Sequence, residues 1–168
     1  MNKLRRNELI SYIIAGILGA VFHFVYEFTG NNPFIGLFFP INESTFEHLK
    51  LIFFPIIIVS VFEYYCLNVQ SENYIATKFL SAIIGMISTI VLFYTYIGVY
   101  GKNVDAVNIA IYYIAMAIAY IFSYFSIKNN RSFYFSERTY FILFCITTLL
   151  FMYFTVNPPS IPLFISPV

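Results

Sequence analysis

Residues 77–100, TKFLSAIIGMISTIVLFYTYIGVY, contain a single charged side chain, that of Lys78. A helix needs about 20 apolar residues to cross the hydrocarbon core of a bilayer, and this stretch is long enough. Four other stretches of similar character occur at 8–29, 45–67, 105–127 and 137–156. The breaks between them carry Gly, Asn or charged residues, which commonly end helices. We therefore predict an all-α fold, a polytopic transmembrane helix bundle of about five spans that forms one integral membrane domain over residues 1–168.

The composition indicates that lipid is the solvent for much of the surface. The chain is 60% hydrophobic and 10% charged, with a mean hydropathy of +0.79, whereas soluble domains carry about 25% charged residues. We predict a multi-pass protein of the cell membrane, with membrane lipid as a partner. The net charge of +1 and the lack of a dense Lys/Arg cluster argue against a nucleic-acid partner. Five spans are few for a stand-alone transporter, so we also expect a homo-oligomer or a second membrane protein as partner.

The distribution of Lys and Arg predicts the orientation of the bundle, because cytoplasmic loops are enriched in these residues. With the N-terminus inside, only Lys50 and Lys102 lie outside. The cytoplasmic set is Lys3, Arg5, Arg6, Lys78, Lys128, Arg131 and Arg138. Residues 30–47 and the tail 157–168 then share the external face. We predict that 33–41 forms a short interfacial or re-entrant loop, and that the proline-rich C-terminal arm folds back through Leu163 and Phe164.

Small residues recur at four-residue spacing in three of the spans. They are Ser11, Ala15 and Gly19; Ser81, Gly85 and Thr89; and Ala115, Ala119 and Ser123. In lipid there is little hydrophobic force between helices, so close approach through small side chains is what packs them. We predict that these three stripes face other helices.

An unusually polar stretch, PINESTFEHLKLIFFP at residues 40–55, stands at the start of the second span. Ser44 and Glu47 have the S-x-x-E spacing of a capping box, in which each side chain bonds the other residue's backbone N–H. Glu43, Glu47 and Lys50 can line one stripe of the helix as ion pairs. His48 is left without a role in this local interpretation.

The first span offers a second polar group at the same predicted depth. His23 and Glu27 are four residues apart and project from one face of the helix. The short connection to the second span predicts that this pair meets Glu47 and His48 near the external surface. Ionisable side chains at membrane depth mark candidate functional sites. Glu63, which precedes Tyr64 and Tyr65, is instead expected to meet water at the cytoplasmic end.

Three interpretations of this polar group remain open: a structural clamp between the two helices, a site that binds or conducts a ligand, proton or ion, and a metal or hydrolytic centre. The candidates for ligand or proton binding are His23, Glu27, Asn42, Glu43, Ser44, Glu47, His48 and Lys50. The candidate metal ligands are His23, Glu27, Glu47 and His48, whose types suit a zinc-like or iron-like ion. A single divalent metal ion is the one cofactor this set suggests, and we assign no catalytic residue.

Four strings in the chain resemble those of a known family. They are HFVYEFTGNNP at 23–33, FPINESTFEHLKLIFFP at 39–55, FYTYIGVYG at 93–101 and NPPSIPLF at 157–164. The chain is similar to small bacterial multi-spanning membrane proteins that are described only as a domain of unknown function and carry an N-E-S-x-x-E-H-L-K motif. The resemblance covers nearly the whole length. It implies a multi-spanning architecture and a shared polar cluster, and it implies no activity.

Motifs of known membrane enzymes are absent from the sequence. H-E-x-x-H does not occur, and neither does a G-x-S-x-G nucleophile string or a P-loop. We therefore favour a non-enzymatic binder, transporter or accessory subunit over an enzyme. The alternative is a metal-dependent intramembrane hydrolase that uses the same His/Glu cluster.

Overall fold

The computed structural model describes residues 2–69 and 71–166, and these residues form helices and connections without strands. The elements in chain order are α1 (Lys3–Phe28), α2 (Pro33–Gly36), α3 (Thr45–Tyr65), α4 (Tyr74–Tyr100), α5 (Asp105–Lys128), α6 (Glu137–Val156) and a 3-10 turn, η1 (Pro162–Phe164). Five of the helices are long and apolar enough to cross a membrane. The predicted all-α bundle with five long apolar helices is confirmed.

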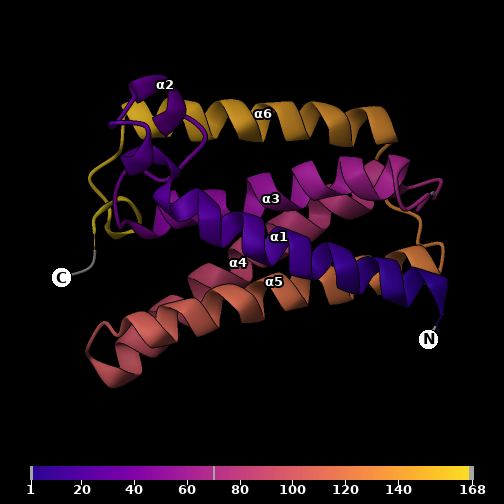
Figure 1. Ribbon diagram of the computed structural model, residues 1–168, viewed down its shortest axis with the longest axis horizontal. Helices are drawn as coiled ribbons and strands as arrows, with labels where there is room; N and C mark the ends of the chain where they lie inside the picture. The colour runs from indigo at the N-terminus through magenta and orange to yellow at the C-terminus, as the bar shows by residue number, and fades with distance from the viewer. Residues whose placement is uncertain (1, 70, 167–168) are drawn as a thin grey trace.

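The five long helices run side by side, with α1 beginning and α6 ending at opposite ends of the bundle (Figure 1). We name these ends by the predicted orientation: α1 begins at the predicted cytoplasmic end, and α3 begins at the predicted external end. Helix α3 is the most enclosed of the five long helices. In its most apolar stretch of 18 residues 72% of the residues are buried, against 11% in the corresponding stretch of α6. It packs against α1 and α4, while α5 packs against α4 and α1.

Small side chains allow this close packing, as the four-residue spacing predicted. All nine residues of the three stripes are buried. A Cβ atom at Gly19 would lie 2.5 Å from the carbonyl oxygen of Leu51, and one at Gly85 would lie 2.8 Å from a methyl carbon of Ile52. Because no side chain fits at either position, glycine sets the approach of α1 and α4 to α3.

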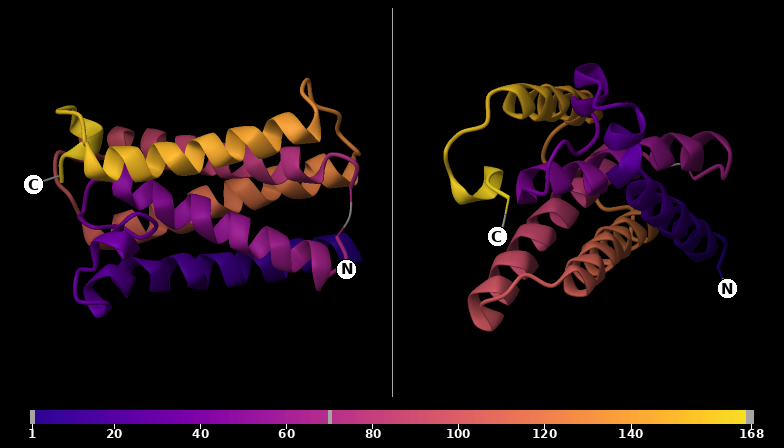
Figure 2. Two further views of the ribbon diagram at one scale, coloured as in Figure 1. Left: turned by 90° about the horizontal axis from the view of Figure 1, so that it is seen from above. Right: turned by 60° about the vertical axis from the view of Figure 1, so that its left-hand side comes forward.

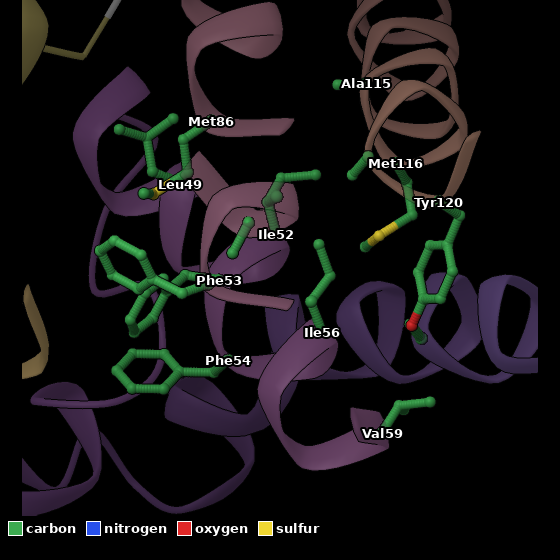
Figure 3. Close-up of a cluster of buried hydrophobic side chains, with 14 of the residues drawn as sticks. Leu49, Ile52, Phe53, Phe54, Ile56, Val59, Met86, Ala115, Met116 and Tyr120 are labelled. Atoms are coloured by element: carbon green, nitrogen blue, oxygen red, sulfur yellow. The ribbon is translucent and has the colours of Figure 1, made fainter. Parts of the chain in front are cut away.

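The centre of the bundle is filled by large apolar side chains of α3. Figure 3 shows Ile52 of this helix between Met86 of α4 and Met116 of α5, with Ile56 below Ile52 and Phe53 on the side away from Met116. Helix α6 joins the core through aromatic rings, since Phe144 and Phe151 each lie 5.3 Å from Phe53 between ring centroids.

The outer surface of the bundle is apolar, as a lipid environment requires. Large hydrophobic side chains are exposed on every long helix, including Ile17, Val61, Val91, Ile121 and Leu149. Soluble monomers rarely show apolar surface on all sides.

The loop between α1 and α3 and the segment after α6 both lie at the predicted external end. Residues 29–44 form a compact loop that includes the single helical turn α2, which begins with Asn32 accepting the backbone N–H of Phe34. The segment after α6 returns toward the start of α3, as the yellow ribbon in Figure 2 shows. There the ring of Phe164 stacks on that of Phe46 at a centroid distance of 4.3 Å.

Candidate functional site

A buried lysine fixes the loop 29–44 onto α3. The Lys50 ammonium has no solvent exposure. It donates to the carbonyl oxygens of Gly36 and Phe39, at 2.9 and 3.4 Å, and to Glu47 Oε2 at 2.7 Å. A lysine has three N–H donors, so all of them are occupied. Lys50 therefore acts as a structural anchor for the loop.

Glu47 extends this anchor to a third element. Its Oε2 also accepts the backbone N–H of Ile41 at 3.0 Å, and its Oε1 accepts the hydroxyl of Thr155 in α6 at 3.1 Å. We call Glu47 and Lys50, with these partners, the loop anchor. It differs from the predicted structural clamp between α1 and α3, because it joins α3 to the loop and to α6.

The cap of α3 differs from the predicted capping box in one half. Ser44 Oγ accepts the backbone N–H of Glu47 at 3.4 Å, as expected. The backbone N–H of Ser44, however, donates to Asn42 Oδ1 at 2.9 Å and not to Glu47. The Glu47 carboxylate instead accepts the Lys50 ammonium and the backbone N–H of Ile41.

Beside the loop anchor, three ionisable side chains converge: His23 from α1, Glu43 from the loop and His48 from α3. We call them the His–Glu–His cluster. One ligand atom from each lies within 4.8 Å of the other two. Glu43 Oε1 is 3.7 Å from His23 Nε2, and Glu43 Oε2 is 3.4 Å from His48 Nε2. The two imidazole rings lie 5.3 Å apart between centroids.

The hydrogen bonds of the cluster define which atoms are free to bind. His48 Nδ1 lies 2.9 Å from the carbonyl oxygen of Ser44. A carbonyl only accepts, so Nδ1 carries a proton and Nε2 is the nitrogen directed at Glu43. When His48 is an imidazolium, its Nε2 also carries a proton and donates it to Glu43; this hydrogen bond lowers the pKa of the Glu43 carboxyl and outweighs the opposing effect of its partial burial.

A cavity of about 360 Å³ opens next to the cluster. His23, Glu27, Asn42 and Glu43 line it, together with Ser166 from the C-terminal segment. Glu27 is exposed, so its carboxylate faces a space that reaches two members of the cluster. The site is therefore open on one side to solvent or to a ligand.

The structure thus divides the sequence-predicted residues into three groups. His23 and His48 come together, and Glu43 is the acidic residue between them. Glu27 lines the adjoining cavity, although the metal-ligand geometry does not include it. Asn42, Ser44, Glu47 and Lys50 hold the loop and the start of α3 in place.

A second polar group, which was not predicted from the sequence, lies at the predicted cytoplasmic end. Glu8, Glu63 and Lys78 are buried together. The expectation that Glu63 meets water is wrong, because its side chain has no exposure. A signal was present: Glu8 precedes Ser11 by three residues, and Lys78 precedes Ser81 by three, so both charges continue the small-residue stripes that face other helices.

Comparison with known proteins defines the family of the chain and nothing finer. No curated protein and no solved structure matches it. A family model described as a family of unknown function, DUF6512, matches residues 1–168. The predicted resemblance to a domain-of-unknown-function family is confirmed over the whole chain, and the protein belongs to the DUF6512 family.

Proposed function

We propose that this protein is a non-enzymatic membrane protein that binds one divalent transition-metal ion through His23, Glu43 and His48. Whether it then acts as a carrier, a transporter or an accessory subunit, the bound ion is the common element. The observation that carries the proposal is the convergence of three ligand atoms of the right type from three separate segments.

The spacing of these atoms supports a tetrahedral ion such as Zn²⁺. Ligand atoms that lie 2.0–2.1 Å from a tetrahedral metal are about 3.4 Å from one another. The distances from Glu43 to His48 and His23, 3.4 and 3.7 Å, are close to that value. Only small side-chain movements are needed to close the shell around an ion.

The surroundings of the ligands also support metal binding. Metal-binding histidines commonly donate their second ring N–H to a carbonyl or carboxylate, which fixes the ring and the tautomer. The bond from His48 Nδ1 to the Ser44 carbonyl is of this kind. The lowered pKa of Glu43 keeps a negative charge next to the two imidazoles, which favours a cation.

One observation favours the alternative, a metal-dependent hydrolase. Three protein ligands leave a fourth position open, as in catalytic zinc sites. Glu27 lines the cavity beside His23 and Glu43, where its carboxylate could accept a proton from a water molecule in that position. On this alternative Glu27→Gln abolishes hydrolysis and leaves the metal bound.

Elemental analysis of the purified chain, after dialysis against Zn²⁺ and then metal-free buffer, tests the proposal. We expect one ion per chain in the wild type and almost none in His48→Ala or Glu43→Gln. Glu27→Gln is the matched control, because it removes a nearby carboxylate that is not a ligand. Folded, monodisperse wild-type protein without metal, or equal metal in His48→Ala, would contradict the proposal.

A further inference from the structure

The buried polar group at the predicted cytoplasmic end combines side chains from four helices. Glu8 belongs to α1, Glu63 to α3, Lys78 to α4 and Ser123 to α5, and each is at most 4% exposed. We call these four residues the inner cluster. The Lys78 ammonium donates to Glu8 Oε1 at 2.9 Å and to Ser123 Oγ at 2.8 Å, and it pairs with Glu63 Oε2. Its three N–H donors are therefore all occupied.

The two carboxylates are only half satisfied. Ser123 donates to Glu8 Oε1 at 2.9 Å, and the hydroxyl of Tyr74 lies 3.0 Å from Glu63 Oε2. The other oxygens, Glu8 Oε2 and Glu63 Oε1, are buried and have no hydrogen-bond partner among the described residues. Lys78 has no further N–H to offer them. Donors thus converge on one oxygen of each carboxylate and leave the second oxygen free.

The charges of the inner cluster do not balance. Two ionised carboxylates and one ammonium leave one negative charge in the interior of an apolar bundle. Burial of an uncompensated charge is so unfavourable that such groups take up a proton instead. A metal cation is a poor substitute, because the Lys78 ammonium already lies between the carboxylates and repels a second cation.

We propose that the inner cluster is a proton-binding site, in which Glu8 and Glu63 share one exchangeable proton around Lys78. The proton occupies one of the two unpartnered oxygens, and the other carboxylate remains the counter-ion of Lys78. This proposal does not depend on metal binding at the opposite end of the bundle.

A route for the proton is present at the same end of the bundle. A cavity of about 640 Å³ between α3, α4 and α6 is lined by Ser60, Tyr74 and Lys78, among others. The hydroxyl of Tyr74 lies 2.7 Å from the Ser60 carbonyl oxygen and 3.0 Å from Glu63 Oε2. It therefore joins the cavity to the buried carboxylate.

The other titratable groups that line this cavity or face Lys78 are tyrosines and two carboxylates, those of Glu72 and Glu137. Tyr120 of α5 presents its ring to the Lys78 ammonium, 5.4 Å from the centroid, and Tyr74 does so at 5.5 Å. Glu137 of α6 lines the cavity but accepts the backbone N–H groups of Ile75 and Ala76, at 2.7 and 3.0 Å. Among the described residues, these neighbours thus add no second cation that would remove the need for a proton.

The inner cluster and the His–Glu–His cluster lie on the same pair of helices in matching register. Glu8 precedes His23 by 15 residues on α1, and Glu63 follows His48 by 15 residues on α3. At 1.5 Å per residue both separations are about 22 Å. Helices α1 and α3 thus carry an ionisable site near each end.

Infrared spectroscopy of the full chain in lipid nanodiscs tests the proposal directly. We expect the C=O band of a protonated carboxylic acid at neutral pH, with an intensity of one group per chain. Deuterium exchange should shift the band, and ¹³C-labelled glutamate should identify it. Glu8→Gln and Glu63→Gln should each remove the band, because one carboxylate then remains to balance Lys78. Both variants should fold, since glutamine mimics a protonated glutamate.

Two further variants sharpen this test. Glu137→Gln is the control, since its carboxylate serves the backbone of α4, and the band should persist. Lys78→Met leaves two carboxylates without an ammonium, so the band should double. Absence of the band in the wild type, or its survival in both Glu8→Gln and Glu63→Gln, would overturn the proposal. A folded state that is stabilised by Na⁺ and lacks the band would assign the inner cluster to a metal cation and overturn it too.

Discussion

The imidazole rings of His23 and His48 lie 5.3 Å apart between centroids, although the two residues belong to different helices. They meet because α1 and α3 pack against each other and are joined by the short, ordered loop 29–44. That loop also places Glu43 next to both rings. The chemistry at this end of the bundle therefore depends on how firmly the loop is held.

The first prediction concerns the loop anchor. Lys50→Met removes three hydrogen bonds and leaves Glu47 as a buried charge without its cation. Loss of one partner of a buried pair costs about 3–5 kcal/mol. We expect a clearly lower thermal midpoint in detergent and weaker metal binding. Lys102→Met, at an exposed lysine, is the control and should leave the midpoint unchanged. Equal midpoints for the two variants would show that Lys50 is not an anchor.

The second prediction concerns the close packing of the helices at Gly19. Gly19→Ala places a methyl group 2.5 Å from the carbonyl oxygen of Leu51. Overpacking of this kind costs about 1–3 kcal/mol, because α1 must move away from Leu51 of α3 and from the Tyr112 hydroxyl of α5, which the new methyl group would also overlap. Gly98→Ala is the matched control, since a Cβ atom there meets nothing within 4 Å. We expect a lower melting temperature for the first variant only. A stable Gly19→Ala protein would mean that α1 and α3 do not pack this closely.

The third prediction concerns pH. A proton on the ligating nitrogen of a histidine excludes a metal ion, so protons compete with zinc for the site. Zinc affinity should therefore fall as the solution is acidified, approaching a hundredfold per pH unit once both ligating nitrogens of the metal-free protein are protonated. Titration calorimetry at several pH values measures this. An affinity that does not change between pH 7.5 and pH 5.5 would exclude histidine ligands.

Glu43 should titrate in a lower pH range than the histidines. Its pKa lies below the ordinary glutamate value of 4.5 because of the hydrogen bond from His48. A depressed pKa means that this contact stabilises the fold above pH 4.5 and is lost as pH falls through the lower value of the folded protein. The side chain of Glu43 is 68% exposed, so the effect on stability is small. Glu43→Gln should flatten the acid limb of the stability curve, and an unchanged limb would contradict this.

The sequence predicts the helices well because lipid imposes a strict length and polarity requirement on every span. The meeting of His23 and His48 was also predictable. His23 lies on the face of α1 that packs against other helices, and the short connection makes α3, which carries His48, its neighbour. The choice between Glu43 and Glu47 was not predictable. The S-x-x-E spacing predicted that Glu47 caps α3. Its partners are instead Lys50, a loop amide and Thr155 of α6. No local pattern in the sequence indicates these partners.

The inner cluster shows a second limit of sequence interpretation. Glu63 stands beside two tyrosines, a pattern typical of the membrane interface, yet it is buried against Lys78 of the next long helix. That pairing depends on the rotation of α3 about its axis, which packing against α1 and α4 determines. A charged residue that continues a small-residue stripe, as Glu8 and Lys78 do, indicates a buried charge better than the neighbouring tyrosines indicate an exposed one.

X-ray absorption spectroscopy at the zinc K-edge of the loaded full chain tests the central claim most directly. We predict a four-coordinate shell of nitrogen and oxygen that contains two imidazoles, and one imidazole in His48→Ala if any metal remains. A zinc shell without imidazole, or a spectrum that is the same in His23→Ala and His48→Ala as in the wild type, would contradict the assignment.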